Sequence, residues 1–213
     1  MKDDQHLYEK MFQFVKEYLQ NKGAETVSAV SAPFRKRSDH IKRVFMWAQR
    51  LVNDDMDIDK KALFTAAIFH DAGYAIAANS REHAEDSAAI CEKYLKENKF
   101  EPEFIDFVVY LMKNHSKKEL LAQEHIPLEL VLLMEADMLD ETGALSIVWD
   151  CMIEGAQELQ TFEKTQQHIY DYSYKTLSTN AMVTDKAKAF WKSKQELMDE
   201  FFKQLSFDLG LDK

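Results

Sequence analysis

The sequence predicts an all-α fold on three observations. The chain of 213 residues contains only 5 Gly and 3 Pro, so few positions interrupt a helix. Its apolar residues recur mainly at spacings of three and four, as on one face of a helix. No stretch alternates apolar and polar residues as a strand does, and no Asn-Gly or Asp-Gly pair marks a hairpin.

The first three helices are predicted from apolar stripes and from residues that begin or end helices. Residues 4–22 carry the first stripe, and Gly23 follows as a residue typical of a helix end. The second helix is expected to start near Ser38. Asp59 is placed to cap the third, which is rich in Ala and Phe and is expected to end at Gly73.

The later helices are predicted in the same way. Ser80 is expected to cap the fourth helix, while Pro102 and Pro127 mark the starts of the fifth and sixth. After Gly143 we expect three long amphipathic helices, the last capped by Thr184, at residues 144–160, 161–178 and 184–208.

Composition indicates one folded unit and excludes several protein classes. A 46% hydrophobic content excludes a disordered chain, and no linker or repeat divides the sequence. We therefore expect one domain over residues 1–213, with a motif-bearing core at about 35–150 and C-terminal helices at about 151–213. The formal charge of −10 argues against an extended nucleic-acid partner, and no apolar run reaches the roughly 18 residues of a membrane span.

The cysteines and the N-terminal residues indicate in which cellular compartment the protein is expected. Cys91 and Cys151 stand far apart with no CxxC motif, which excludes a disulfide scaffold and a zinc ribbon. The first residues, M-K-D-D-Q-H, contain no apolar stretch of the kind found in signal peptides. A reduced, cytoplasmic protein is therefore expected.

Four metal-capable side chains fall at the core-facing ends of four predicted helices: His40, His70, His115 and Asp137. Each lies on the apolar stripe of its helix, and Asp71 lies beside His70. Burying a carboxylate costs roughly several kcal/mol unless it is paired or binds a metal. Any one of these residues alone is more simply read as a hydrogen-bonded core residue. Together they predict a site for a divalent transition metal ion between core helices.

The order of these residues resembles the H…HD…D signature of the HD-domain metal-dependent phosphohydrolase superfamily. Residues 40–44, H-I-K-R-V, resemble its H-x-x-R-V helix, and residues 66–73, A-A-I-F-H-D-A-G, resemble its A-A-x-x-H-D-x-G segment. Residues 114–116, N-H-S, resemble a downstream histidine motif. Residues 135–144, E-A-D-M-L-D-E-T-G-A, resemble the D-A-D-x-L-D-x-x-G-A stretch of small bacterial members. The resemblance covers roughly residues 35–150.

The resemblance implies a helical bundle that holds a metal through His40, His70, Asp71 and Asp137. It implies a phosphoric ester hydrolase that acts on a small phosphorylated metabolite or nucleotide through metal-activated water. Asp71 would be the catalytic residue, as a ligand and as a bridge between ions. The cofactor would be one or two divalent transition ions, with Mn, Fe, Ni, Co and Zn as the candidates.

His83 and His115 leave three interpretations open. Superfamily members with the longer pattern H…HD…H…H…D resemble binuclear enzymes, in which these two histidines hold a second ion. The alternatives are that both contact substrate or that both are structural. The remaining histidines, His6, His125 and His168, lack a partner pattern and are expected at the surface.

Nearby charged residues have a functional and a simpler interpretation. Arg81, Lys117 and Lys118 are candidates for contacts with substrate phosphate, and the basic run 35–37 before His40 would help to draw an anionic substrate to the site. Such runs are also common on solvated faces. Asp140, three residues after Asp137, is a candidate to orient a ligating histidine.

The sequence departs from the family pattern at two positions. Glu135 replaces the first acidic residue of the D-A-D motif, and Tyr74 stands where many members have Lys or Arg that can contact phosphate.

The same six candidate ligands also resemble those of the diiron oxygenases of this superfamily. A helical domain that binds a metal or ligand without turnover is the third interpretation.

Overall fold

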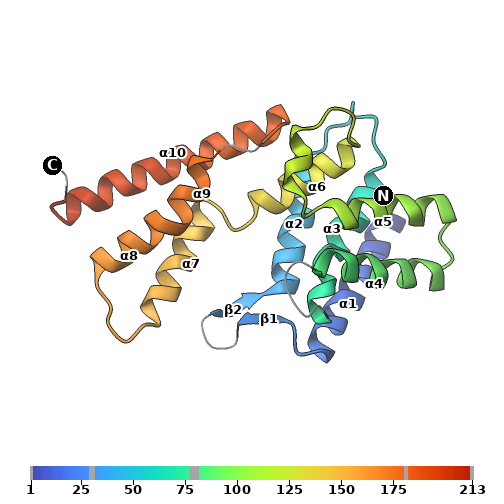
Figure 1. Cartoon of the computed structure of the whole chain (residues 1–213), viewed down its shortest axis with the longest axis horizontal. Coiled ribbons are helices and arrows are strands. Elements are labelled where there is room, and N and C mark those ends of the chain that lie inside the picture. Colours follow the sequence, from blue (N-terminus) through green and yellow to red (C-terminus); the bar gives the residue numbers. More distant parts are fainter. Residues whose placement is uncertain (1, 29–31, 77–81, 180–181, 212–213) are drawn as a thin grey trace. The chain divides into compact units, whose positions relative to one another are not determined.

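The computed structural model describes residues 2–28, 32–76, 82–179 and 182–211 (Figure 1). Helices dominate these residues, which confirms the all-α prediction. The chain forms two compact units, Met1–Asp140 and Glu141–Lys213. The expectation of a single domain stays a prediction.

The first unit contains six α-helices among its described residues: α1 (Lys2–Asn21), α2 (Arg37–Leu51), α3 (Lys60–Phe69), α4 (His83–Glu97), α5 (Pro102–Asn114) and α6 (Leu128–Leu139). Two 3₁₀ turns accompany them, η1 (Ala72–Ala75) and η2 (Lys118–Ala122). Within this unit α2 packs on α3 and α6, while α4 packs on α5 and η1.

Most predicted helix ends in this unit are confirmed. Gly23 follows α1 with a φ of 69°, a conformation that glycine adopts readily. The Asp59 side chain accepts a hydrogen bond of 2.9 Å from the backbone N–H of Ala62, which caps α3. Pro102 is the first residue of α5, where its missing N–H costs nothing.

Two boundaries differ from the prediction. The third helix ends at Phe69 instead of Gly73, because the chain tightens into η1 where Gly73 packs against α4. Helix α4 begins at His83. The predicted cap of that helix, Ser80, lies outside the described residues.

A short antiparallel hairpin was missed by the sequence analysis. Strand β1 (Thr26–Ser28) pairs with β2 (Ala32–Lys36), with Thr26 opposite Lys36. Strands of three and five residues are too short to display a clear alternation of apolar and polar residues. The hairpin leads directly into α2, so it sets where the first residues of that helix lie.

Aromatic packing fixes α1 against the helices that carry the motif residues. The Tyr8 ring lies 5.4 Å from Phe45 of α2 and 5.8 Å from Phe64 of α3, in edge-to-face contacts. Phe12 adds a third contact of this kind, 5.1 Å from Phe45. Such pairs contribute roughly 0.5–1.5 kcal/mol each beyond the area they bury. Helix α1 therefore supports α2, which carries His40 in its first turn, and α3, which His70 directly follows.

The second unit is formed by α7 (Ala144–Gly155), α8 (Phe162–Ile169), a π-helical turn η3 (Tyr170–Tyr174), α9 (Lys175–Ser178) and α10 (Asp185–Asp208). The predicted cap of the last helix is confirmed, since the Thr184 side chain accepts from Ala187. The predicted single helix over 161–178 is wrong in detail, because η3 interrupts it. No helix among the described residues is long and apolar enough to cross a membrane.

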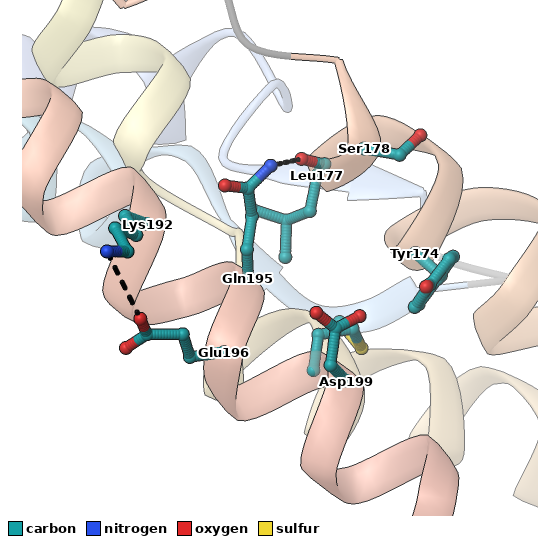
Figure 2. A pocket seen from close by; sticks show the side chains of 8 residues that line it. Tyr174, Leu177, Ser178, Lys192, Gln195, Glu196 and Asp199 are labelled. Atoms are coloured by element: carbon teal, nitrogen blue, oxygen red, sulfur yellow. Dashed lines mark hydrogen bonds and ion pairs between the residues drawn. The ribbon is translucent and has the colours of Figure 1, made fainter.

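An open cavity of about 370 Å³ lies in the second unit between α9 and α10 (Figure 2). Its polar side chains bind one another or the backbone. Gln195 donates to the Leu177 carbonyl at 2.6 Å, and Lys192 lies 3.7 Å from Glu196. None of the predicted metal ligands lines this cavity.

Candidate metal centre

The first unit brings together all six side chains that the sequence singled out as metal ligands. They come from distant parts of the chain: His40 lies in α2, His70 and Asp71 directly follow α3, His83 begins α4, His115 directly follows α5, and Asp137 lies in α6. Among the described residues they form two groups whose donor atoms lie within 4.8 Å of one another.

The first group consists of His40, His70 and Asp137. The Nε2 atoms of the two histidines are 3.2 Å apart. Oδ1 of Asp137 lies 3.5 Å from Nε2 of His40 and 3.9 Å from Nε2 of His70. Two imidazoles and one carboxylate thus converge on one point.

The second group consists of Asp71, His83 and His115, and all three are buried. The Nε2 atoms of His83 and His115 are 3.3 Å apart. Oδ1 of Asp71 lies 3.7 Å from Nε2 of His83. This group therefore repeats the chemistry of the first, with two imidazoles and a carboxylate.

Asp71 also reaches the first group. Its Oδ2 lies 3.6 Å from Nε2 of His40, and its Oδ1 lies 3.6 Å from Nε2 of His70. The carboxylate therefore stands between the two groups with an oxygen within reach of each. A carboxylate in this position can bridge two cations.

Hydrogen bonds on the far side of three rings fix how these rings face the centre. His70 Nδ1 donates to the Ala67 carbonyl at 2.9 Å, and His115 Nδ1 donates to the Met112 carbonyl at 2.6 Å. His40 Nδ1 lies 2.7 Å from Asp140 Oδ2. With the proton held at Nδ1, Nε2 of His70 and of His115 presents a lone pair to the centre, and Nε2 of His40 faces the centre as well.

This donor set fits a divalent transition ion. Nε2 lone pairs that face each other at 3.2 and 3.3 Å repel one another unless a proton or a cation lies between them. Neutral imidazole and ionised carboxylate are ligands that such ions favour, whereas Mg²⁺ prefers oxygen alone. His40, His70, Asp71 and Asp137 could hold one ion, and Asp71, His83 and His115 a second.

The candidate orienting residue Asp140 lies where the sequence placed it. Besides its contact with His40, it accepts two hydrogen bonds from Arg43, of 2.8 Å from Nε and 3.0 Å from Nη2. This bidentate pair holds the carboxylate in place, and the carboxylate in turn holds the His40 ring. No role for Arg43 was predicted from the sequence. Its spacing of three residues from His40, one helical turn, was the signal available.

Burial and neighbouring charges shift the histidine pKa values in opposite directions. Burial alone would lower the pKa of His40, but hydrogen bonds to Asp137 and Asp140 raise it to about 10. Burial lowers the pKa of His115 to about 3, and the nearby His70 acts in the same direction. His115 is therefore neutral at physiological pH and keeps a lone pair for a ligand.

The two carboxylates of the centre have lowered pKa values. Burial would raise the pKa of Asp71, but its interactions with the His70 and His40 imidazoles outweigh that effect and lower it. Burial would also raise the pKa of Asp137, but the nearby Lys118 and the hydrogen bond to His40 hold it well below its usual range. Both carboxylates are therefore ionised at neutral pH and available to a cation.

The candidate phosphate contacts have different surroundings. Lys118 lies 2.7 Å from Asp137 Oδ2, at the edge of the first group. Lys117 instead donates to the Asn114 side chain at 2.9 Å. Arg81 lies outside the described residues. Of the two candidates that the structure describes, Lys118 is the one in contact with a predicted ligand.

The other histidines do not share one environment. His6 and His125 are exposed, as expected. The expectation for His168 was wrong, since its side chain is only 19% exposed. Its Nδ1 lies 2.9 Å from Glu154 and its Nε2 lies 3.5 Å from Asp150, both on α7. These partners are four residues apart on one helix face, a spacing that a search for carboxylate pairs would have found.

Comparisons with known proteins agree with this fold. The family model for the HD domain matches residues 37–142. An HD-superfamily hydrolase from Bacillus thuringiensis is similar, with a TM-score of 0.70 and 21% identity over 98% of this chain and 100% of that chain. A predicted HD-superfamily hydrolase from an uncultured Thermotogales bacterium gives a TM-score of 0.64 and 18% identity over 94% and 92%.

Bacillus subtilis YpgQ is also similar, with a TM-score of 0.65 and 19% identity over 98% of this chain and 99% of that chain. A second structure of YpgQ, in complex with ADP, gives a TM-score of 0.65 and 20% identity over 96% of each chain. No curated protein matches the sequence. At these identities the structural likeness concerns the fold.

Proposed function

Because the chain belongs to the HD-domain superfamily, we propose that it is a metal-dependent phosphohydrolase that cleaves a small phosphorylated metabolite or nucleotide. The observation that carries the proposal is the position of Asp71 between two groups of imidazole and carboxylate donors. Two cations held 3.5–4 Å apart are a common device for displacing a group at phosphorus.

The residues of the two groups would hold the ions, with Asp71 shared between them. When bound, such ions lower the pKa of a water molecule and neutralise charge that builds on phosphoryl oxygens. The chain itself contributes a fixed, desolvated set of donors. The Ala67 and Met112 carbonyls orient His70 and His115, and Asp140 orients His40.

Positive charge beside the centre supports an anionic substrate. Lys118 is about one-third exposed and lies at the edge of the first group, so its ammonium is placed to attract a phosphate. The ADP in the YpgQ complex supports a nucleotide as the phosphorylated compound. YpgQ supports this point because its fold is similar to that of this chain.

A diiron oxygenase is the second candidate function. The observation that favours it is the same six-residue donor set, which also suits two iron ions. An oxygenase consumes dioxygen and depends on iron, whereas a phosphohydrolase releases phosphate and needs no dioxygen.

A paired screen tests the proposal. We expect protein loaded with Mn²⁺ or another divalent transition ion to release phosphate from at least one member of a panel of sugar phosphates and nucleotides. Activity should disappear after chelation and return when the ion is restored. Dioxygen uptake by the iron-loaded protein, without phosphate release, would favour the oxygenase. Absence of turnover with every ion and compound would overturn both proposals.

A further inference from the structure

Arg37, the first residue of α2, lies beside the metal centre without forming a hydrogen bond to its nearest carboxylate. Its Nη1 is 3.8 Å from Asp71 Oδ2, beyond hydrogen-bond distance. The side chain is only 16% exposed, so the guanidinium is held close to the centre. Nothing in the sequence distinguished it from the other members of the basic run 35–37.

The ring of Tyr74 holds Arg37 in this position. The guanidinium carbon is 3.5 Å from the ring centroid, a close cation–π contact. The His83 imidazole stacks on the same ring, with centroids 4.4 Å apart and planes 12° apart. Because two groups cannot fill the same space over one ring, they lie on opposite faces. Tyr74 thereby links Arg37 to a histidine of the second group and has no free face for a nucleobase.

Among the described residues, Arg37, Arg43 and Lys118 lie near the site carboxylates and differ in how closely they are paired with them. Arg43 forms two hydrogen bonds to Asp140, and Lys118 lies 2.7 Å from Asp137. Arg37 is the one whose distance from its carboxylate is too long for a hydrogen bond. The N–H donors of its planar guanidinium therefore form no hydrogen bond to Asp71.

We propose that Arg37 binds the phosphoryl group of the substrate at the metal centre, and that Tyr74 is the residue that positions it. The inference rests on the proposed function. A guanidinium beside a carboxylate shared by two metal ions would face their positive charge, and an anion between them removes this repulsion. Arginine suits this role because its fork matches two phosphate oxygens at once.

A structural alternative makes a different prediction. If Arg37 served only to balance the charge of Asp71, its loss would alter metal binding and leave phosphate binding to the loaded protein intact. If Arg37 binds phosphate, its loss weakens phosphate binding and leaves the metal content unchanged. The two readouts together separate these roles.

The test measures binding of inorganic phosphate to the metal-loaded full chain by calorimetry, with metal content determined on the same samples. We expect Arg37→Gln to weaken phosphate binding by about 10- to 100-fold, as for the loss of charge-assisted hydrogen bonds. Arg37→Lys should restore only part of this loss, because it supplies the charge without the fork. Tyr74→Leu should weaken binding more than Tyr74→Phe, which keeps the ring.

Arg50→Gln is the matched control, since Arg50 also stands over a ring on α2, 4.7 Å from Trp47, but is exposed at the other end of the helix. It should leave phosphate binding unchanged. Unchanged phosphate affinity in Arg37→Gln, or a loss of metal from that variant, would overturn the inference. Phosphate binding that depends on Arg37 in a protein that hydrolyses no ester would support the inference and refute the proposed function.

Discussion

Replacing Asp71 with Ala is expected to reduce phosphate-ester hydrolysis by at least about 1,000-fold and to lower the metal content of the chain. The shared carboxylate reaches both groups of donors, so its loss removes a ligand from each. Metal ions supply roughly several kcal/mol of transition-state stabilisation, and each 1.36 kcal/mol is worth about tenfold in rate.

The measurement is turnover on the best substrate from the screen, with metal content and circular dichroism on the same protein. Asp55→Ala is the control, because Asp55 is an exposed residue between α2 and α3. It should retain activity and metal. Wild-type turnover in a folded, helical Asp71→Ala protein would refute the role assigned to this carboxylate.

Substituting Gly73 with Ala is expected to destabilise the protein by about 3 kcal/mol or more, at the upper end of the range for overpacking. An added Cβ would lie 2.1 Å from the His83 carbonyl oxygen and 2.5 Å from the Ser87 backbone nitrogen. Both are backbone atoms, so relief requires α4 to move away from η1. That movement would also displace His83 from the metal centre.

Thermal unfolding measures this effect, and a decrease in Tm of roughly 6–12 °C is expected for a chain of this size. Gly155→Ala provides the comparison, since nothing lies within 4 Å of its added Cβ. It should unfold within about 2 °C of wild type. If Gly73→Ala unfolds at the wild-type temperature, the close approach of η1 and α4 is not what requires glycine in this motif.

The sequence predicted those parts of the fold that depend on local chemistry. Asp59, Pro102 and Thr184 mark helix starts because their side chains act within their own first turn. The end of α3 was misplaced because Gly73 meets a helix that follows it in the chain. The π-helical turn η3 was not predicted either, because the spacing of apolar residues along a helix does not reveal one inserted residue.

In the candidate site, as in the fold, some features could be predicted from the sequence and others could not. The ligand set could be predicted because four of its members lie on apolar stripes and because the order of motifs, which adds Asp71 and His83, resembles a family. The stack of Arg37 on Tyr74 could not, because it joins the hairpin–α2 junction to η1 only in the folded chain. The pairing of Arg43 with Asp140 likewise connects residues 97 positions apart.

The central claim is that the first unit holds divalent transition ions in two adjacent groups that share Asp71. Elemental analysis of the full chain, purified without chelator and loaded with a single transition metal, tests it most directly. We expect about two ions per wild-type chain, and a fall toward one ion in His115→Ala. A wild-type chain that retains only one transition ion after loading, or none, would contradict this claim.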